Sequence, residues 1–226
     1  MDVARIGRES GPAKRTDDIG QRRPVPPTTV RRLSTYYRVL GTVQADGQPN
    51  VSSETLASLT GFTAAQVRRD LAYFGSFGKR GVGYAVAALR QRLAAILGID
   101  RGWRIGLVGV GNLGRALVAY PGFNNQGFDV VAAFDSDASV IGSRVNGQFV
   151  RPVAALENAV RDEQIDMVIV TVPAAAAQQV VDQAVAAGVR AILNFAPTQL
   201  RVPSRVQLSN VDLAVEVEYL SYSLAG

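Results

Sequence analysis

The chain has 226 residues, a formal net charge of +5, and neither cysteine nor histidine. The missing cysteines exclude disulfides, thiolate nucleophiles and sulfur-ligated metals, and the missing histidines remove the commonest general base and metal ligand. The charge is uneven, since residues 1–32 and 33–95 each carry a net charge of +4 and residues 96–226 carry −3. A basic front half on an acidic back half indicates two tasks, with a polyanion as the partner of the front half.

The first predicted segment is an arm, residues 1–28, which is rich in arginine, glycine and proline and has no apolar period. Such a basic arm is expected to be disordered, either as a solvated tail or as a segment that touches phosphates. It lacks the apolar part of a secretory signal, and no apolar run in the chain approaches the roughly 18 residues of a membrane span. We therefore expect a cytoplasmic protein.

Residues 29–98 carry the pattern of a helix-turn-helix followed by a glycine hairpin. An apolar stripe indicates a first amphipathic helix. The stripe consists of Leu33, Tyr36, Tyr37, Leu40 and Val43. A second helix starts at Ser52 or Ser53 and ends at Gly61, and a third lies within Thr63–Phe74. Two short helices joined by a tight turn form the helix-turn-helix pattern, and "FGKRGVGY" is predicted as the hairpin.

The third predicted helix has a basic outward face. Val67, Leu71 and Phe74 are its inward positions. The outward positions are Ala64, Gln66, Arg68 and Arg69. In a DNA major groove, glutamine can pair with adenine, and arginine with guanine or phosphate. Lys79 and Arg80 on the hairpin can contact the neighbouring backbone. The pattern favours DNA binding, and the alternative is a basic helical hairpin whose charges are solvated.

Strands and helices alternate over residues 99–210, starting with the buried strand "RIGLVGVG". This alternation predicts a parallel sheet with helices on both faces, the doubly wound α/β class. The stretch "GVGNLG", Gly109–Gly114, follows the strand and opens a helix, which is the context of the dinucleotide-binding G-x-G-x-x-G motif. Its glycines allow a tight turn, a close approach of the backbone to a pyrophosphate, and packing of helix on strand.

Asp135 ends the next predicted strand, 26 residues after Gly109 and slightly beyond the expected spacing of ~20. Its carboxylate would accept hydrogen bonds from the adenosine ribose and repel a 2′-phosphate. The predicted ligand is therefore NADH or NAD+ and not NADP. The alternative is a glycine turn with no role in ligand binding.

The last residues, 211–226, fit two patterns. The strand pattern consists of Val211, Leu213, Val215 and Val217, and the helical stripe consists of Leu213, Val217, Leu220 and Leu224. We favour a short strand that passes into a terminal helix. This helix could pack on its own domain or on a partner subunit.

Two observations argue against a dehydrogenase. No substrate domain remains after the dinucleotide-binding half, and the chain has no histidine, no cysteine and no lysine beyond Lys79. Tyrosine, arginine and aspartate could still act as acid or base, so binding without turnover is the favoured interpretation. The alternatives left open are an NAD-dependent oxidoreductase with a helical dimerisation domain, and an α/β protein whose basic front binds RNA or an acidic partner protein.

Several stretches occur in a characteristic order: "SSETLA", "QVRRDLAYFGSFGKRGVGY", "GVGNLGRAL", "YPGF", "VTVP", "NFAP" and "NVDL". From about Val30 onward, this ordered set resembles the Rex family of redox-sensing transcriptional repressors. The resemblance implies an N-terminal winged helix, a Rossmann domain that binds NAD(H), and a C-terminal helix exchanged within a homodimer. It also implies a repressor that senses the NADH/NAD+ ratio and releases its palindromic operator DNA when NADH binds.

The resemblance completes the set of predicted site residues. The predicted DNA contacts are Ser53, Gln66, Arg68, Arg69, Lys79 and Arg80. The predicted cofactor contacts are Gly109, Val110, Gly111, Asn112, Leu113, Gly114, Asp135, Tyr120, Thr171, Val172, Pro173, Asn194 and Phe195. Tyr120 is expected near the nicotinamide, and Arg38 and Asp212 as the charged pair that couples the domains in one state. We expect neither a metal site nor a catalytic residue.

Overall fold

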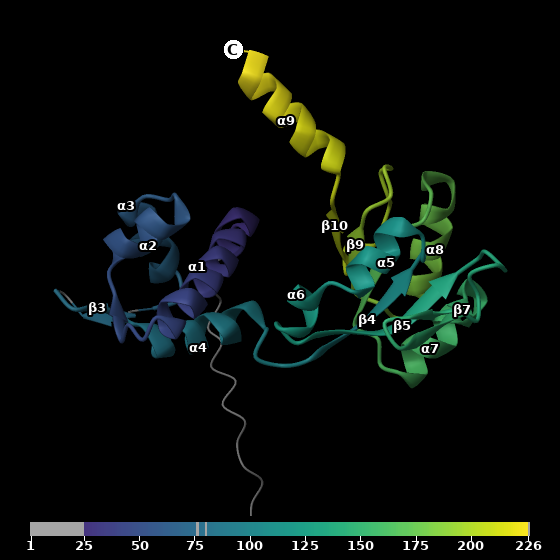
Figure 1. Ribbon diagram of the computed structural model, residues 1–226, viewed down its shortest axis with the longest axis horizontal. Coiled ribbons are helices and arrows are strands. Elements are labelled where there is room, and N and C mark those ends of the chain that lie inside the picture. The colour runs from purple at the N-terminus through teal and green to yellow at the C-terminus, as the bar shows by residue number, and fades with distance from the viewer. Residues whose placement is uncertain (1–24, 76, 80, 226) are drawn as a thin grey trace, which may run out of the picture. The chain divides into compact units, whose positions relative to one another are not determined.

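The computed structural model describes residues 25–75, 77–79 and 81–225, without the side chain of Lys79 (Figure 1). It separates into two compact units that divide between Leu93 and Ala94. The predicted arm lies mostly outside the described residues, and its last residues, from Pro27 on, belong to the first helix. The observed division lies within the helix Val86–Leu97. We predicted the division after residue 98, just beyond the end of that helix.

The first unit packs helices on a small antiparallel sheet (Figure 1). Its elements are α1 (Pro27–Ala45), β1 (Asn50–Val51), α2 (Ser53–Thr60), α3 (Ala64–Ala72), β2 (Gly78–Lys79), β3 (Gly83–Ala85) and α4 (Val86–Leu97), which continues into the second unit. The strand order is β1-β3-β2, and β2 and β3 form an antiparallel hairpin. This arrangement is the predicted winged helix-turn-helix, with the hairpin as the wing.

Two hydroxyl groups fix where α2 and α3 begin. Ser52 Oγ accepts a hydrogen bond from the Thr55 backbone N–H at 3.0 Å, and Thr63 Oγ1 accepts one from the Gln66 N–H at 3.1 Å. Such caps each stabilise a helix by about 1 kcal/mol. Ser52 is therefore the cap, and Ser53 is the first helical residue. The buried core of the unit includes Leu33, Tyr36, Leu40, Leu56, Val67 and Leu71.

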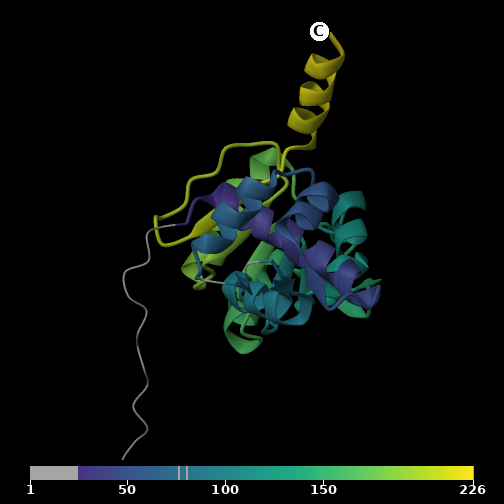
Figure 2. The same cartoon turned by 90° about the vertical axis from the view of Figure 1, so that its left-hand side faces the viewer.

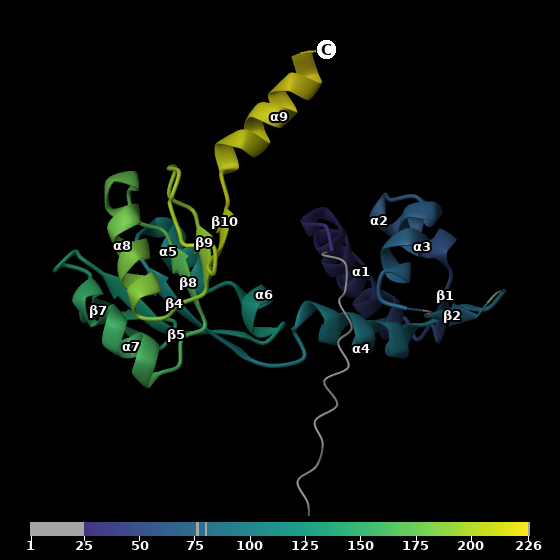
Figure 3. The same ribbon diagram turned by 180° about the vertical axis from the view of Figure 1, so that it is seen from behind.

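The second unit is a sheet covered by helices on both faces (Figures 1 and 3). Its elements are β4 (Trp103–Val108), α5 (Asn112–Val118), α6 (Pro121–Asn124), β5 (Phe128–Asp135), β6 (Arg144–Val145), β7 (Gln148–Pro152), η1 (Val153–Ala155), α7 (Leu156–Asp162), β8 (Met167–Val170), α8 (Ala174–Ala186), β9 (Ala191–Asn194), β10 (Gln207–Asn210) and α9 (Leu213–Ala225). The strand order is β10-β9-β8-β4-β5-β7-β6. Every pairing is parallel except β6 with β7, as the doubly wound class predicts.

The strands of this sheet are buried on both sides. In β8, Ile169 belongs to one apolar cluster, whereas its neighbours Val168 and Val170 belong to another. Successive side chains of a strand point to opposite faces, so both faces of β8 are covered. This explains why the strands appear in the sequence as continuous apolar runs without alternation.

The terminal helix α9 stands away from the sheet that precedes it (Figures 1 and 2). The strand pattern at residues 211–217 is wrong, because β10 ends at Asn210 and Leu213 already begins the helix. None of its residues is buried, and its large apolar side chains are 53% to 88% exposed. The exposed side chains are Leu213, Val215, Val217, Tyr219, Leu220, Tyr222 and Leu224. Of the two predicted packings, α9 does not adopt the one on its own domain.

Candidate functional site

A glycine turn joins β4 to α5 at the carboxyl end of the sheet. Gly109 has φ 100°, a left-handed conformation that glycine adopts readily, and a Cβ there would lie 2.7 Å from the Thr171 carbonyl oxygen. A Cβ on Gly114 would collide with the carbonyl oxygen of Gly109. Gly111 differs, because a Cβ built on it would meet nothing within 4 Å. The outer glycines therefore let the chain pack closely, and Gly111 leaves open space over the backbone.

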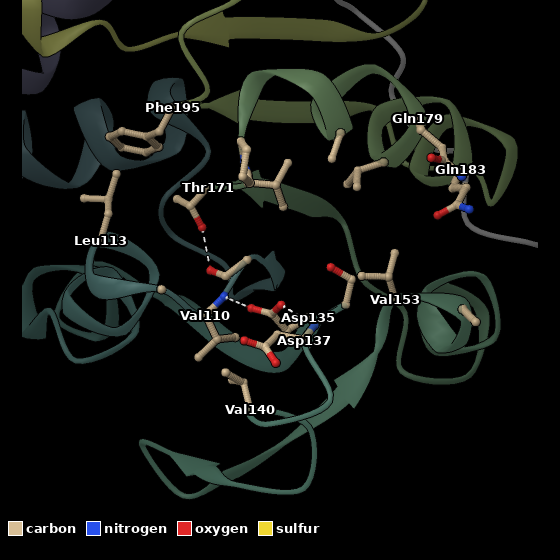
Figure 4. A pocket seen from close by; sticks show the side chains of 18 of the residues that line it. Val110, Leu113, Asp135, Asp137, Val140, Val153, Thr171, Gln179, Gln183 and Phe195 are labelled. Atoms are coloured by element: carbon tan, nitrogen blue, oxygen red, sulfur yellow. Dashed lines mark hydrogen bonds between the residues drawn. The ribbon is translucent and has the colours of Figure 1, made fainter.

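The turn is held by side chains from the two neighbouring strands. Thr171, after β8, donates its hydroxyl to the Gly109 carbonyl at 2.7 Å. Asp135, at the end of β5, accepts the Val110 backbone N–H at 2.6 Å on one carboxylate oxygen and the Asp137 N–H at 2.9 Å on the other. The Asp135 carboxylate thus bridges the turn and the loop that follows β5 (Figure 4).

A cavity of about 860 Å³ opens over this turn. Strands β5 and β7 follow β4 on one side, whereas β8, β9 and β10 lie on its other side. The order in which the chain adds strands to the sheet therefore reverses at β4. Doubly wound sheets bind their ligands at the carboxyl ends of strands at such a point. The volume is within the range of small-molecule sites.

Most of the predicted cofactor residues line this cavity. They are Gly109, Val110, Gly111, Leu113, Asp135, Thr171, Val172, Pro173 and Phe195. Figure 4 places Phe195 and Leu113 at one end, Asp135 in the middle, and Val153 with Gln183 at the other end.

Four predicted cofactor residues lie outside the lining. Asn112 and Gly114 belong to α5 next to the turn. Tyr120 is 55% exposed and packs edge to face against Phe123, with ring centres 5.4 Å apart. Asn194 is 1% exposed, and its carboxamide bonds to Asn210 and to both backbone groups of Ala196. In this structure Asn194 therefore supports the loop after β9.

Other lining residues were not predicted. They are Ser136, Asp137, Val140, Val153, Ala154, Ala176, Gln179, Val180, Gln183 and Pro197. The four from α8 recur at helical spacing, so they share one face of that helix. That spacing is visible in the sequence, but only the strand order of the folded sheet shows that this face of α8 borders the cavity.

Asp137 makes the middle of the cavity more acidic. Hydrogen bonds from the side chain and the backbone of Ser139 hold the pKa of Asp137 below its usual value, so this carboxyl group stays ionised beside Asp135. A ligand that approaches the loop after β5 with a further anionic group would meet two carboxylates. Neutral hydroxyl groups, by contrast, would find acceptors there.

The first unit carries a second candidate site on α2, α3 and the wing. Arg68 of α3 is exposed, and its Nη1 donates to Ser53 Oγ at 2.7 Å and to Glu54 Oε1 at 2.8 Å. Arg69 is also exposed on α3. Arg80 and the side chain of Lys79, both predicted to contact DNA, lie outside the described residues.

Gln66 lies at the edge of this face because a buried carboxylate holds it. Its Nε2 donates to Asp70 Oδ1 at 2.8 Å, and Asp70 is fully buried. A carboxylate accepts hydrogen bonds only, so the amide nitrogen must point toward Asp70 and the amide oxygen away from it. Gln66 is half-buried and less outward than we expected from the helical pattern.

No group of three or more histidine, cysteine, aspartate or glutamate side chains among the described residues could hold a metal ion. None of their helices combines the length and the apolar character that crossing a membrane would require.

Comparisons with known proteins bear on both sites. Residues 24–72 match a family model described as "Putative DNA-binding protein N-terminus", and residues 100–198 match one described as "CoA binding domain". The "Redox-sensing transcriptional repressor Rex" of Carboxydothermus hydrogenoformans is 47% identical over 200 residues, which cover 88% of this chain and 96% of that protein. The protein of the same name from Streptomyces coelicolor is 43% identical over 216 residues, or 96% of this chain and 81% of that one.

Solved structures agree with these relatives. The "Crystal structure of RSP in complex with beta-NAD+ and operator DNA" is 36% identical with a TM-score of 0.86, and the match covers 89% of this chain and 93% of that one. The "Crystal structure of RSP in complex with beta-NADH" is 35% identical with a TM-score of 0.81, and the match covers 88% and 94% of the two chains.

Proposed function

This chain belongs to the Rex family of redox-sensing transcriptional repressors, and we propose that the cavity and the basic face are the two sites through which it works. It is a DNA-binding repressor that senses NADH through its Rossmann-type domain. The observation that carries the site assignment is the Asp135 carboxylate, which bridges the glycine turn to the next loop inside the cavity.

The proposed position of the cofactor follows from that bridge. The pyrophosphate would lie over Gly111, where the backbone is open, and the adenosine ribose would donate its hydroxyls to Asp135. A 2′-phosphate would meet Asp135 together with ionised Asp137, so we propose that the site excludes NADP(H). The nicotinamide would then lie toward Phe195 and Leu113 (Figure 4).

Discrimination between NADH and NAD+ has to come from the end of the cavity that contains Phe195 and Leu113, where the nicotinamide would lie. NAD+ carries a positive charge on the nicotinamide ring that NADH lacks, and an apolar wall disfavours a buried charge. The apolar side chains of Phe195 and Leu113 would therefore favour NADH. Any factor by which NADH lowers the affinity for DNA must equal the factor by which DNA lowers the affinity for NADH.

On the first unit, we propose that Ser53, Gln66, Arg68, Arg69, Lys79 and Arg80 contact the operator. Arg68 stands at the first helical turns of α3, the part of such a helix that reaches base edges. To bind a base or phosphate, it would exchange its contact with Glu54 for one with DNA. That exchange costs little, because the Arg68–Glu54 pair is exposed.

Three further features complete the proposal. The apolar face of α9 would pack on a second copy of the chain, in a homodimer that reads a palindromic operator. Arg38 and Asp212 would form a charged pair between domains in one of the two states. The protein would bind NADH without consuming it, and a cytoplasmic location stays a prediction from the sequence.

The function is tested by gel shift on palindromic duplexes titrated separately with NADH, NAD+ and NADPH. We expect NADH alone to release the DNA. Release by NADPH at the same concentrations would refute the exclusion of NADP(H). Slow loss of NADH in a solution of the protein alone would instead support the oxidoreductase alternative.

The cofactor assignment is tested by the Asp135→Ala variant. It loses hydrogen bonds between a carboxylate and the ribose hydroxyls, so the affinity for NADH should fall about 10- to 100-fold. Calorimetric titration with NADH measures this fall, and the variant should still bind DNA. If NADH releases the variant from DNA at wild-type concentrations, Asp135 is not the ribose contact.

A further inference from the structure

The side chain of Gln66 on α3 has a fixed orientation, because its amide nitrogen completes the hydrogen bonding of the Asp70 carboxylate. Arg32 donates to both carboxylate oxygens, at 2.6 and 2.8 Å, and the Tyr36 hydroxyl donates at 2.9 Å. Gln66 Nε2 donates the fourth hydrogen bond, at 2.8 Å. An ionised carboxylate offers about four acceptor positions, so these donors saturate Asp70.

Reversal of the Gln66 amide would be unfavourable. It would place the amide oxygen against the carboxylate of Asp70, where two acceptors repel each other, and it would leave Asp70 one donor short although it is 0% exposed. The loss of a hydrogen bond to a charged group shifts such an equilibrium by about tenfold or more. The nitrogen therefore stays on Asp70, and the oxygen points away from it.

The amide oxygen of Gln66 can be reached from outside the protein. No donor among the described residues bonds to it, yet it is not one of the buried side-chain atoms that lack a partner in this part of the chain. It therefore keeps accessible surface. Gln66 is also the third residue of α3, within the part of a recognition helix that reaches base edges.

The chemistry of DNA limits what this oxygen can bind. Phosphate oxygens only accept hydrogen bonds, and so do guanine and thymine in the major groove. The donors in the major groove are the 6-amino group of adenine and the 4-amino group of cytosine. Gln66 thus differs from Arg68 and Arg69, whose guanidinium groups can bind either a phosphate or a guanine.

We propose that Gln66 is a specificity-determining residue that accepts a hydrogen bond from the exocyclic amino group of adenine or cytosine, and that Asp70 is the positioning residue that sets its polarity. This inference rests on the proposed DNA-binding site. In each half-site of the operator, one position should therefore favour adenine or cytosine over guanine and thymine on the strand that faces Gln66.

The first test replaces each base pair of a palindromic duplex in turn and measures gel shifts with the full-length wild type and Gln66→Leu. At one position per half-site, the wild type should prefer a base with an amino group about five- to tenfold. In Gln66→Leu, this preference should fall to about onefold at that position alone. The salt dependence of binding should not change, because the variant loses no phosphate contact.

The second test removes only the amino group. At the position found, adenine is replaced by purine or cytosine by 2-pyrimidinone, each of which carries hydrogen in place of the amino group, and the base present shows which of the two is read. The wild type should bind the altered duplex about five- to tenfold more weakly. Gln66→Leu should bind both duplexes equally, which separates the lost contact from the weakened base pair.

The role of Asp70 is tested with Asp70→Asn under conditions where circular dichroism shows the variant folded. The new carboxamide can donate to the Gln66 oxygen, so the amide is no longer held in one orientation. The preference for amino bases should fall to about onefold to twofold, whereas a purely structural role would weaken binding to all duplexes alike. The tests on the wild type and Gln66→Leu do not depend on this variant.

Arg69→Leu separates this inference from the proposed DNA-binding site, because it removes an exposed cation from the same helix and should weaken binding to every duplex. If it does so but the wild type binds the altered duplex as well as the natural one, the Gln66 contact is refuted and the DNA-binding site stands. If Arg69→Leu changes nothing, the site is wrong and the inference fails with it. A Gln66-dependent preference for guanine or thymine would refute the polarity set by Asp70.

Discussion

At the scale of single residues, one buried carboxylate ties together the first unit. Asp70 is 0% exposed and accepts hydrogen bonds from Arg32 at 2.6 and 2.8 Å, from the Tyr36 hydroxyl at 2.9 Å, and from Gln66. Burial alone would raise the pKa of Asp70, but the hydrogen bonds from Arg32, Gln66 and Tyr36 outweigh it and hold the pKa below the usual value. Arg32 and Tyr36 come from α1, so Asp70 fixes α3 on α1.

Asp70→Asn should lower the stability of the first unit by about 2–3 kcal/mol at neutral pH, because Arg32 loses its partner in a largely buried pair. The folded pKa of Asp70 lies below the unfolded value of about 3.9. The stabilisation is therefore complete above that value and is lost as the pH falls through it toward the folded pKa. The difference in unfolding free energy between wild type and variant should therefore be smaller in acid than at neutral pH. Urea unfolding under both conditions measures it.

Two controls accompany this experiment. Glu157→Gln breaks an exposed pair with Arg161 and should change stability by less than about 0.5 kcal/mol. Trp103, the single tryptophan, lies in the second unit, so its fluorescence should not report the loss that far-UV circular dichroism detects. A difference between wild type and Asp70→Asn that stays constant into acid would contradict the pKa argument.

At the scale of elements, the glycine turn shows steric fit overriding helix propensity. Gly114 lies inside α5, where alanine would normally be favoured by about 1 kcal/mol. The helix nevertheless needs glycine there, since a Cβ would collide with the Gly109 carbonyl. The packing of α5 against the end of β4 therefore sets the shape of the turn that faces the cavity.

Gly114→Ala should lower the stability of the second unit by about 1–3 kcal/mol and weaken NADH binding, because α5 must move away from the turn. Gly111→Ala is the contrasting variant: its φ is −73° and the added methyl meets open space, so folding should be unaffected. The same methyl would occupy the space proposed for the pyrophosphate, and NADH binding should fall. Thermal unfolding and NADH titration of both variants test this, and unchanged NADH binding in Gly111→Ala would count against the proposed pyrophosphate position.

At the scale of the whole molecule, the described residues leave the apolar side chains of helix α9 uncovered. Helix α9 has no buried residue, although its apolar side chains would form a large exposed surface on a monomer. Soluble proteins rarely leave such a patch uncovered unless it is an interface. The first unit is basic and the second unit is acidic, which fits the proposed division of DNA binding and cofactor binding between them.

Deletion of residues 213–226 should convert a dimer into a monomer and weaken binding to a palindromic duplex by roughly a hundredfold, because the two half-sites would no longer be bound by one particle. Leu220→Glu should also weaken the dimer and its binding to the duplex. Glu218→Gln on the same helix should change neither. Sedimentation velocity and gel shift measure the two results. A truncated protein that keeps the assembly state of the wild type would refute the role of α9.

How much the sequence predicts differs between the two sites. Glycine spacing and apolar periods are local signals, so the helix-turn-helix, the turn at Gly109–Gly114 and the position of Asp135 could be predicted from neighbouring residues. Asn194 could not be placed in this way, because its hydrogen bonds to Asn210 depend on the pairing of β9 with β10. The burial of Asp70 likewise depends on α1, which is distant in sequence.

The sequence by itself determined the helix-turn-helix and the alternation of strands and helices, because backbone preference and side-chain period act over a few residues. It also determined the glycine turn and the acidic residue at the end of the second strand of the Rossmann-type domain. It did not determine the end of the chain, where the strand pattern at residues 211–217 was wrong. Only the tertiary structure decided that Val153 and Gln183 face the same cavity as Gly109, and that α9 is left uncovered. The reason is that strand order and packing join residues far apart in the chain, and no local pattern encodes which distant face a side chain will meet.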